Sequence, residues 1–203
     1  MSDKKIYLYP VWIRLWHWLN ALLCLVLILT GISMQYTGLE FHFIRFDIAV
    51  SLHNITGITL TASYLIFLIG NLVTPNGRYY KMKIKGLIKR LMKQFRFYTI
   101  GIFKKEDPPY PISKKRKFNP LQKFTYIVTM YIFLPLVFIS GWALLFPEMI
   151  INVVFGWSGI HLTDLLHVIT GFFISIFMIV HIYFCTIGTT ASSNFKSMIN
   201  GWH

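Results

Sequence analysis

Four long apolar segments constrain this chain more than any other feature of its sequence. They cover residues 12–35, 49–73, 121–146 and 162–188. Each can cross a bilayer, because a hydrocarbon core about 30 Å thick needs roughly 20 apolar residues in a helix. Only 13% of the 203 residues are charged, whereas a soluble domain has about 25%. The sequence therefore predicts an all-α membrane protein, a four-transmembrane-helix bundle in which residues 1–203 form a single membrane-embedded domain.

Positive charge is distributed very unevenly between the two sides of such a bundle. Of 20 Lys and Arg residues, 14 lie between Pro75 and Phe118, in the link that joins the second and third spans. If the helices alternate in direction, all the others except Arg45 fall on that same side. Basic loops stay in the cytoplasm, so we expect both termini and the link to be cytoplasmic. The formal charge of +13 then reflects topology, and no nucleic-acid partner is expected.

Part of this link reads as a basic amphipathic helix. Lysines and arginines alternate there with apolar residues at helical spacing, namely Ile84, Leu87, Ile88, Leu91, Met92 and Phe95. We expect such a helix to lie on the anionic inner leaflet with its apolar side facing the lipid. A docking surface for a cytoplasmic partner is the alternative interpretation.

Four of the seven histidines lie within the spans, where an ionisable side chain is rare and usually functional. At about 1.5 Å per residue, His17 and His181 lie roughly 10 Å and 9 Å to the cytoplasmic side of their helix centres. His53 and His167 lie roughly 12 Å to the outer side. The four therefore sort into two pairs at matching depths. The other three, His42, His161 and His203, are interpreted as non-ligands.

The spacing on the fourth span indicates what these pairs bind. His167 and His181 are 14 residues apart, which is about 21 Å of rise and about 40° short of four full turns. Both imidazoles therefore leave one face of the helix at two levels, as two stacked haems require. A metal site without haem would place its ligands at one level. Because no C-x-x-C-H motif occurs, the haems would be non-covalent and therefore b-type. Each would be held by one pair of histidines, that is, by bis-His ligation.

Glycines follow three of the histidines at regular spacings. His53 and His167 each begin the pattern H-x-I-T-G, which ends at Gly57 and Gly171, and Gly31 lies 14 residues after His17. We expect these glycines to leave clearance for porphyrin edges, although close helix packing is the alternative reading.

Three other residues in or beside the spans have expected roles. Arg14 is a candidate counter-charge for propionates on the cytoplasmic side, and Arg45 for those on the outer side. Both could equally be ordinary interface anchors. Pro135 is expected to kink the third span, which carries no histidine and closes the bundle.

With these residues the chain resembles, over nearly its whole length, the four-helix di-haem cytochrome b subunits of nickel–iron hydrogenases, formate dehydrogenase N and thiosulfate reductases. That family has one His on the first helix, one on the second, and two on the fourth separated by a 14-residue step. The resemblance implies one haem on His17 and His181 and another on His53 and His167, in agreement with the depths. It also implies a multi-pass protein of the bacterial cytoplasmic (inner) membrane, in contact with lipid.

The resemblance further implies a quinone site at the start of the third span. The family pattern there is aromatic-Asn-x-Gly-Gln-Lys, and this chain has Phe118-Asn119-Pro120-Leu121-Gln122-Lys123. Asn119, Gln122 and Lys123 match, and Leu121 replaces the glycine. In the family pattern His181 would also contact the quinone. The quinone would be menaquinone or ubiquinone. Asn119 followed by Pro120 is also an ordinary helix start.

The implied function is electron transfer between the quinone pool and a periplasmic redox partner of a respiratory oxidoreductase complex. The chain has no iron–sulfur, molybdenum or nickel motif and no candidate catalytic residue. It would therefore be a quinone-reactive subunit rather than a complete enzyme, and its partner would carry iron–sulfur, other metal or c-type haem centres.

Three alternatives stay open at this point. One is a stand-alone quinol-oxidising cytochrome b that passes electrons to a small molecule. Another is a haem-free anchor or transporter whose histidines relay protons. The third is a thiol oxidase, which would need cysteines in the outer links, but Cys24 and Cys185 both lie inside apolar spans.

Overall fold

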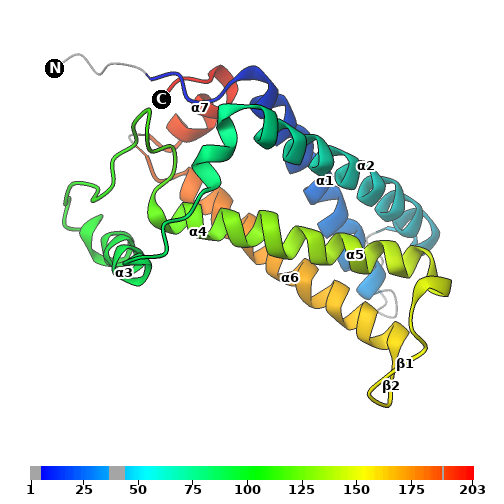
Figure 1. The fold of residues 1–203 in the computed structure, drawn as a ribbon. Helices are drawn as coiled ribbons and strands as arrows, with labels where there is room; N and C mark the ends of the chain where they lie inside the picture. Colours follow the sequence, from blue (N-terminus) through cyan, green and yellow to red (C-terminus); the bar gives the residue numbers. More distant parts are fainter. Residues whose placement is uncertain (1–5, 37–43, 189) are drawn as a thin grey trace.

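The computed structural model describes residues 6–36, 44–188 and 190–203. Four helical spans in this part are long and apolar enough to cross a membrane, and Figure 1 shows them side by side. They are α1 (Val11–Gln35), α2 (Phe46–Val73), the continuous run Pro120–Leu145, and α6 (Gly159–Cys185). The predicted four-helix membrane bundle is confirmed, with the second and fourth spans beginning at Phe46 and Gly159 rather than at 49 and 162. Lys4, Lys5 and His42 lie outside the described residues.

The third span is interrupted where the sequence predicts a kink. It consists of α4 (Pro120–Val128), a π-helical turn η3 (Thr129–Phe133) and α5 (Leu134–Leu145). The Leu134 N–H bonds back five residues to the Thr129 carbonyl. Pro135 has no N–H to continue this register toward the Met130 carbonyl. The Tyr64 hydroxyl of α2 donates to that carbonyl instead, at 2.8 Å. The helix thus accommodates Pro135 by a π turn and a bond from its neighbour.

The spans pack as two close pairs, α1 against α2 and α5 against α6. Trp16 of α1 stacks on Phe67 of α2 with ring centroids 4.4 Å apart, and its indole N–H donates to the Ser63 carbonyl at 3.0 Å. A buried core then joins the two pairs, consisting of Ile13, Tyr64, Phe67, Leu134 and Ile174. Its residues come from the beginning of α1, the second half of α2 and the middle of the third and fourth spans.

The link between α2 and α4 contains η1 (Pro75–Tyr80), α3 (Leu87–Arg96) and a π-helical turn η2 (Phe97–Gly101). α3 forms within the stretch that the sequence marks as amphipathic, and it stands beside the bundle at the end where α4 begins (Figure 1). Leu87 and Leu91 are partly buried, but the rest of its apolar side, continued by Ile84 just before the helix, is not covered by protein. The exposed fractions of Ile84, Ile88 and Met92 are 80%, 77% and 60%. This side is therefore free to face lipid.

The opposite end carries a short hairpin between α5 and α6. After η4 (Pro147–Met149), β1 (Val153–Val154) pairs antiparallel with β2 (Trp157–Ser158). The two turn residues, Phe155 and Gly156, both have positive φ, at 49° and 84°. This is the geometry of a type I′ turn, which matches the twist of a two-residue hairpin.

The C-terminal segment closes back onto the N-terminal one. α7 (Ser193–Asn200) ends at Gly201, whose φ of 87° is the left-handed conformation that favours glycine. The Gly201 carbonyl accepts the Leu8 N–H at 2.9 Å, and Tyr7 pairs with Trp202 in a backbone bridge. A side chain at Gly201 would collide with Tyr7, because its Cβ would lie 2.6 Å from that ring.

Candidate functional site

The four histidines of the spans meet as two separate pairs. The ring centroids of His17 and His181 are 6.1 Å apart, and those of His53 and His167 are also 6.1 Å apart. The first pair joins the beginning of α1 to the end of α6, and the second joins the beginnings of α2 and α6. These are the same two pairs that were predicted from the depth of each histidine along its helix. Elsewhere, His161 is exposed and His203 lies beside the Ser197 hydroxyl.

A hydroxyl on the neighbouring helix orients His53. The Thr30 Oγ1 of α1 lies 2.9 Å from His53 Nδ1 and 2.7 Å from the Val26 carbonyl. Because the hydroxyl donates its proton to that carbonyl, its oxygen is left to accept from the Nδ1–H of the imidazole. This arrangement favours the tautomer that leaves Nε2 unprotonated, which is the form that binds a metal.

The same arrangement recurs around His167. Ser140 Oγ of α5 lies 3.0 Å from His167 Nδ1 and donates to the Leu136 carbonyl at 2.8 Å. The next residue, Gly141, lies so close that an added Cβ would be 3.0 Å from His167 Cε1. Glycine at this position leaves space for the His167 imidazole.

Sequence reasoning missed Thr30, Ser140 and Gly141 as parts of the site. A signal for them exists, since each of the four spans carries one hydroxyl residue followed directly by glycine. All four hydroxyl residues are buried, namely Thr30, Thr56, Ser140 and Thr170. Two of these dipeptides follow the histidines in the H-x-I-T-G pattern, and the other two face the histidines from α1 and α5.

The predicted glycines occupy different surroundings. A Cβ on Gly31 would lie 3.6 Å from His53 Cε1, and one on Gly57 would lie 4.0 Å from Leu27. For Gly171, no protein atom would come within 4 Å. Gly31 thus lies against the His53 ring, Gly57 fits the helix-packing reading, and Gly171 leaves its stretch of α6 uncovered by side chains.

The His17–His181 pair is surrounded by aromatic rings. The Tyr126 hydroxyl of α4 lies 3.3 Å from His181 Nδ1, and Phe177 stacks on the His181 ring with an angle of 17° between the planes. His17 meets the Trp18 ring edge to face. Among the described residues, buried His17 Nδ1 has no hydrogen-bond partner.

Two of the four predicted quinone residues build the start of α4. Asn119 and Gln122 form a reciprocal capping box, in which Asn119 Oδ1 accepts the Gln122 N–H at 2.9 Å. The Asn119 amide also donates to the Tyr98 hydroxyl at 2.7 Å. Burial raises the pKa of Tyr98, although the Asn119 bond opposes the shift, so the phenol stays protonated. The Tyr98 ring in turn contacts Phe184 of α6, near His181, with centroids 4.6 Å apart.

The third predicted quinone residue, Lys123, lines a basic pocket outside the bundle. This pocket of about 470 Å³ lies between η1, α3 and the start of α4. Asn119 and Gln122 are not among the residues that line this pocket.

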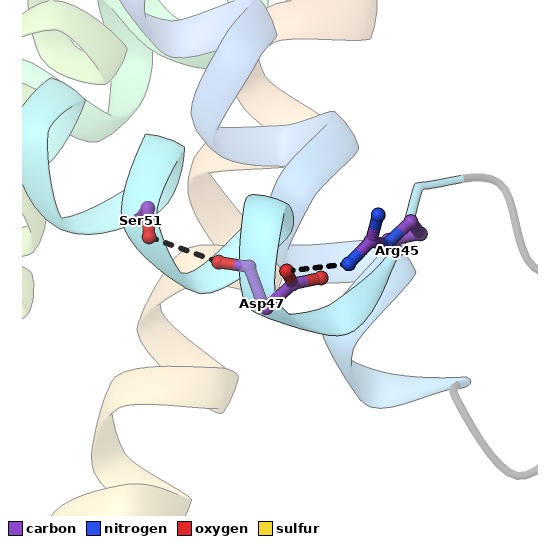
Figure 2. Close-up of polar contacts among 3 residues, drawn as sticks. All are labelled: Arg45, Asp47 and Ser51. Atoms are coloured by element: carbon purple, nitrogen blue, oxygen red, sulfur yellow. Dashed lines mark hydrogen bonds and ion pairs between the residues drawn. The ribbon is translucent and has the colours of Figure 1, made fainter.

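The two predicted counter-charges have other partners. Arg14 donates to the Ile199 carbonyl of α7, and its buried Nε has no partner among the described residues. Arg45 pairs with Asp47 at 2.9 Å, and Asp47 also accepts a bond from Ser51 through its backbone carbonyl (Figure 2). Both charged side chains are largely exposed, so this contact favours the interpretation of Arg45 as an interface anchor.

Known proteins match this chain over most of its length. A sequence model of the prokaryotic cytochrome b561 family matches residues 8–201. A putative cytochrome of Escherichia coli, YdhU, is 38% identical over 98% of this chain and 75% of its own length. A probable Ni/Fe-hydrogenase B-type cytochrome subunit of Rhodobacter capsulatus is 26% identical over 88% of this chain and 73% of its own length. No solved structure matches. The chain therefore belongs to the prokaryotic cytochrome b561 family, and it is a multi-pass membrane electron-transfer protein of the kind that binds b-type haem.

Proposed function

We propose that this chain holds two b-type haems and moves electrons between membrane quinone and a redox subunit on the outer face of the bacterial inner membrane. His17 with His181 would hold one haem and His53 with His167 the other, each by non-covalent bis-His ligation. When bound, the haems would supply reversible one-electron storage at two depths. Residues 1–203 would form one domain, in keeping with the family match to residues 8–201.

The spacing of the histidine pairs supports this ligand assignment. If a metal bonds Nε2 of both rings at about 2.0 Å, the ring centroids are about 6.2 Å apart. Both observed separations are 6.1 Å. The donor set also fits, because imidazole nitrogens suit iron and the hydroxyls of Thr30 and Ser140 favour the required tautomer of His53 and His167.

Quinone would react near the His17–His181 pair. Support comes from the matching residues Asn119, Gln122 and Lys123, and from the ring contact that connects Tyr98 to Phe184. Asn119 and Gln122 would then act partly by fixing the start of α4. The Tyr126 hydroxyl beside His181 Nδ1 would orient that imidazole.

The charge distribution and one relative support the orientation and the partner. The link at 75–118 carries 14 of the 20 basic residues, which favours a cytoplasmic link and cytoplasmic termini. The relative named as a hydrogenase cytochrome subunit suggests that a separate redox subunit supplies or receives electrons. The hairpin at Val153–Ser158 would face that subunit.

Haem content of purified variants tests the ligand assignment. By pyridine haemochrome assay the wild type should carry close to two haems, and His167→Ala and His181→Ala should each retain one. His161→Ala is the matched control on the same helix and should retain both. Retention of both haems in all three variants would disprove the assignment.

A separate measurement tests the quinone step. Asn119→Ser keeps a cap for α4 but removes the amide that donates to Tyr98. We expect slower haem reduction by a menaquinol or ubiquinol analogue in this variant, with haem content unchanged. An unchanged rate in both Asn119→Ser and Lys123→Ala would reject this site and leave the haem assignment intact.

A further inference from the structure

The pocket between η1, α3 and the start of α4 is lined by an unusual number of cations. Eight basic side chains line its volume of about 470 Å³, namely Arg78, Lys81, Lys83, Arg90, Lys115, Arg116, Lys117 and Lys123. None of the described residues that line it is Asp or Glu. Such a concentration of like charge within one pocket is unfavourable unless an anion is present.

These cations are positioned by the protein without being neutralised. The Arg90 guanidinium donates to the carbonyls of Lys83 and Lys85, and the Arg116 guanidinium lies over the Tyr110 ring at 5.4 Å. In the described part of the chain, the only ion pairs are Arg45–Asp47 and Arg96–Glu106, so no pocket cation pairs with a carboxylate. Their charges stay available to a ligand.

Lys117 forms the floor of this arrangement. Only 3% of Lys117 is exposed, and its ammonium lies 4.6 Å from the centroid of the Tyr9 ring and 3.3 Å from the side-chain oxygen of Asn76. Burial lowers the pKa of Lys117 to about 8, which still leaves it mostly protonated at neutral pH. An anion bound nearby would favour the charged form of Lys117 and so offset the cost of its desolvation.

The pocket opens where a lipid headgroup would lie. Pro120 and Lys123 line it and also form the first turn of the third membrane span. An apolar groove of about 320 Å³ adjoins it on α3, and Leu87 lines both. The groove is otherwise lined by Ile84, Gly86, Ile88 and Lys89. A charged pocket and an apolar groove that share one residue suit a ligand with a charged head and an apolar tail.

We propose that the pocket bounded by η1, α3 and α4 binds the phosphate-bearing headgroup of an anionic phospholipid, with an acyl chain in the groove along α3. The lysines and arginines would contact the phosphate, as basic pockets at a cytoplasmic membrane surface do. Ile84 and Ile88 would contact the chain. The site would fix the basic link against the membrane beside the start of α4. Lys123 is shared with the proposed quinone site and is therefore left unchanged in the test below.

Lipid retention by the purified protein tests this proposal. Wild type would be reconstituted in vesicles of phosphatidylcholine with or without phosphatidylglycerol, re-extracted in mild detergent, and examined by native mass spectrometry. We expect one phosphatidylglycerol to remain bound, and no phosphatidylcholine. Excess inorganic phosphate should not displace it, because phosphate lacks the chain that fills the groove.

Two triple variants distinguish a site from general surface charge. Lys81, Lys83 and Lys115, all exposed and lining the pocket, would be changed to Gln in one protein. Lys85, Lys104 and Lys114, equally exposed but outside the pocket, would be changed to Gln in the other. We expect at least a tenfold loss of phosphatidylglycerol retention in the first and less than a twofold loss in the second.

Either of two results would overturn the proposal. Equal losses in both triple variants would mean that the lipid is held by diffuse charge. If inorganic phosphate displaces the lipid and binds as tightly as phosphatidylglycerol does, the pocket binds a soluble anion. Unchanged haem content in both proteins would show that the bundle is folded, so that a loss of lipid is attributed to the pocket.

Discussion

Thr30→Val tests whether a hydroxyl on α1 prepares His53 to bind metal. Valine replaces the hydroxyl by a methyl group of similar size, so the packing of α1 is preserved. Thr30 is only 1% exposed, so water has little access to replace the lost oxygen. The Nδ1–H of His53 would lose its partner at 2.9 Å, and the Leu27 carbonyl would remain as an acceptor.

The expected effect follows from what this bond does. An unpaired buried donor costs about 1–3 kcal/mol. Loss of the outer partner of a ligating histidine weakens metal binding by roughly 10–100-fold, or about 1.4–2.8 kcal/mol. Since the Leu27 carbonyl can accept part of the lost bond, we expect haem at the His53–His167 pair to be held about tenfold more weakly. The His17–His181 pair should be unaffected and serves as an internal reference.

The measurement is the rate of haem loss to a haem-scavenging protein, combined with a redox titration of the haem that remains. Thr59→Val is the matched control, because Thr59 makes the same bond to the carbonyl four residues earlier, to Ile55 at 2.8 Å, but is exposed. If Thr30→Val and Thr59→Val lose haem at the same rate and have the same potentials, the hydroxyl does not position His53 and the reasoning fails.

Three further changes have definite expected outcomes. Gly141→Ala should displace the His167 ring, because the new Cβ would lie 3.0 Å from Cε1, and haem content should fall toward one per chain by pyridine haemochrome; two retained haems would contradict this. Tyr64→Phe should lower the free energy of unfolding of the detergent-solubilised protein by about 1–2 kcal/mol, and with it the melting temperature, because the Met130 carbonyl loses its donor. An unchanged melting temperature would mean that the π turn needs no such bond. Raising the pH from about 7 to about 9 should weaken phosphatidylglycerol retention, because Lys117, with a pKa of about 8, loses its charge while Tyr9, with a pKa of about 12, keeps its proton; retention that is constant over this range would exclude Lys117 from the site.

Hydropathy alone predicted the four spans, since a bilayer demands long apolar helices whatever their partners are. Depth along each helix also indicated which histidines lie at the same level, because the rise per residue is fixed. Both inferences use only distances along a single helix.

Contacts between helices could not be predicted in the same way. That Thr30 faces His53 and that Ser140 faces His167 depends on how α1 turns against α2 and α5 against α6. Rotation of a helix about its own axis is set by side-chain packing, which one sequence does not display. The direction of Lys123 is another such case, because it depends on where the link folds beside α4.

Local chemistry accounts for the remaining differences. The Asn119–Pro120 start was predicted both as a helix cap and as part of a ligand site, two roles that are compatible, and the structure shows the cap. Pro135 was expected to bend its helix, and the structure shows a π turn before it and the Tyr64 hydroxyl bonded to the Met130 carbonyl. The cap is local and follows from the sequence, whereas the bond from Tyr64 depends on the neighbouring helix.

The pairing of the histidines has a consequence for biogenesis. Each pair takes one member from an early helix, α1 or α2, and the other from α6, which is synthesised after the other three spans. The strand-like bond between residues 6–9 and 201–203 forms later still. During translation the early helices therefore enter the membrane with half of each pair alone. Neither pair can close before α6 is inserted, and until then His17 and His53 lie in the bilayer without their partner histidines.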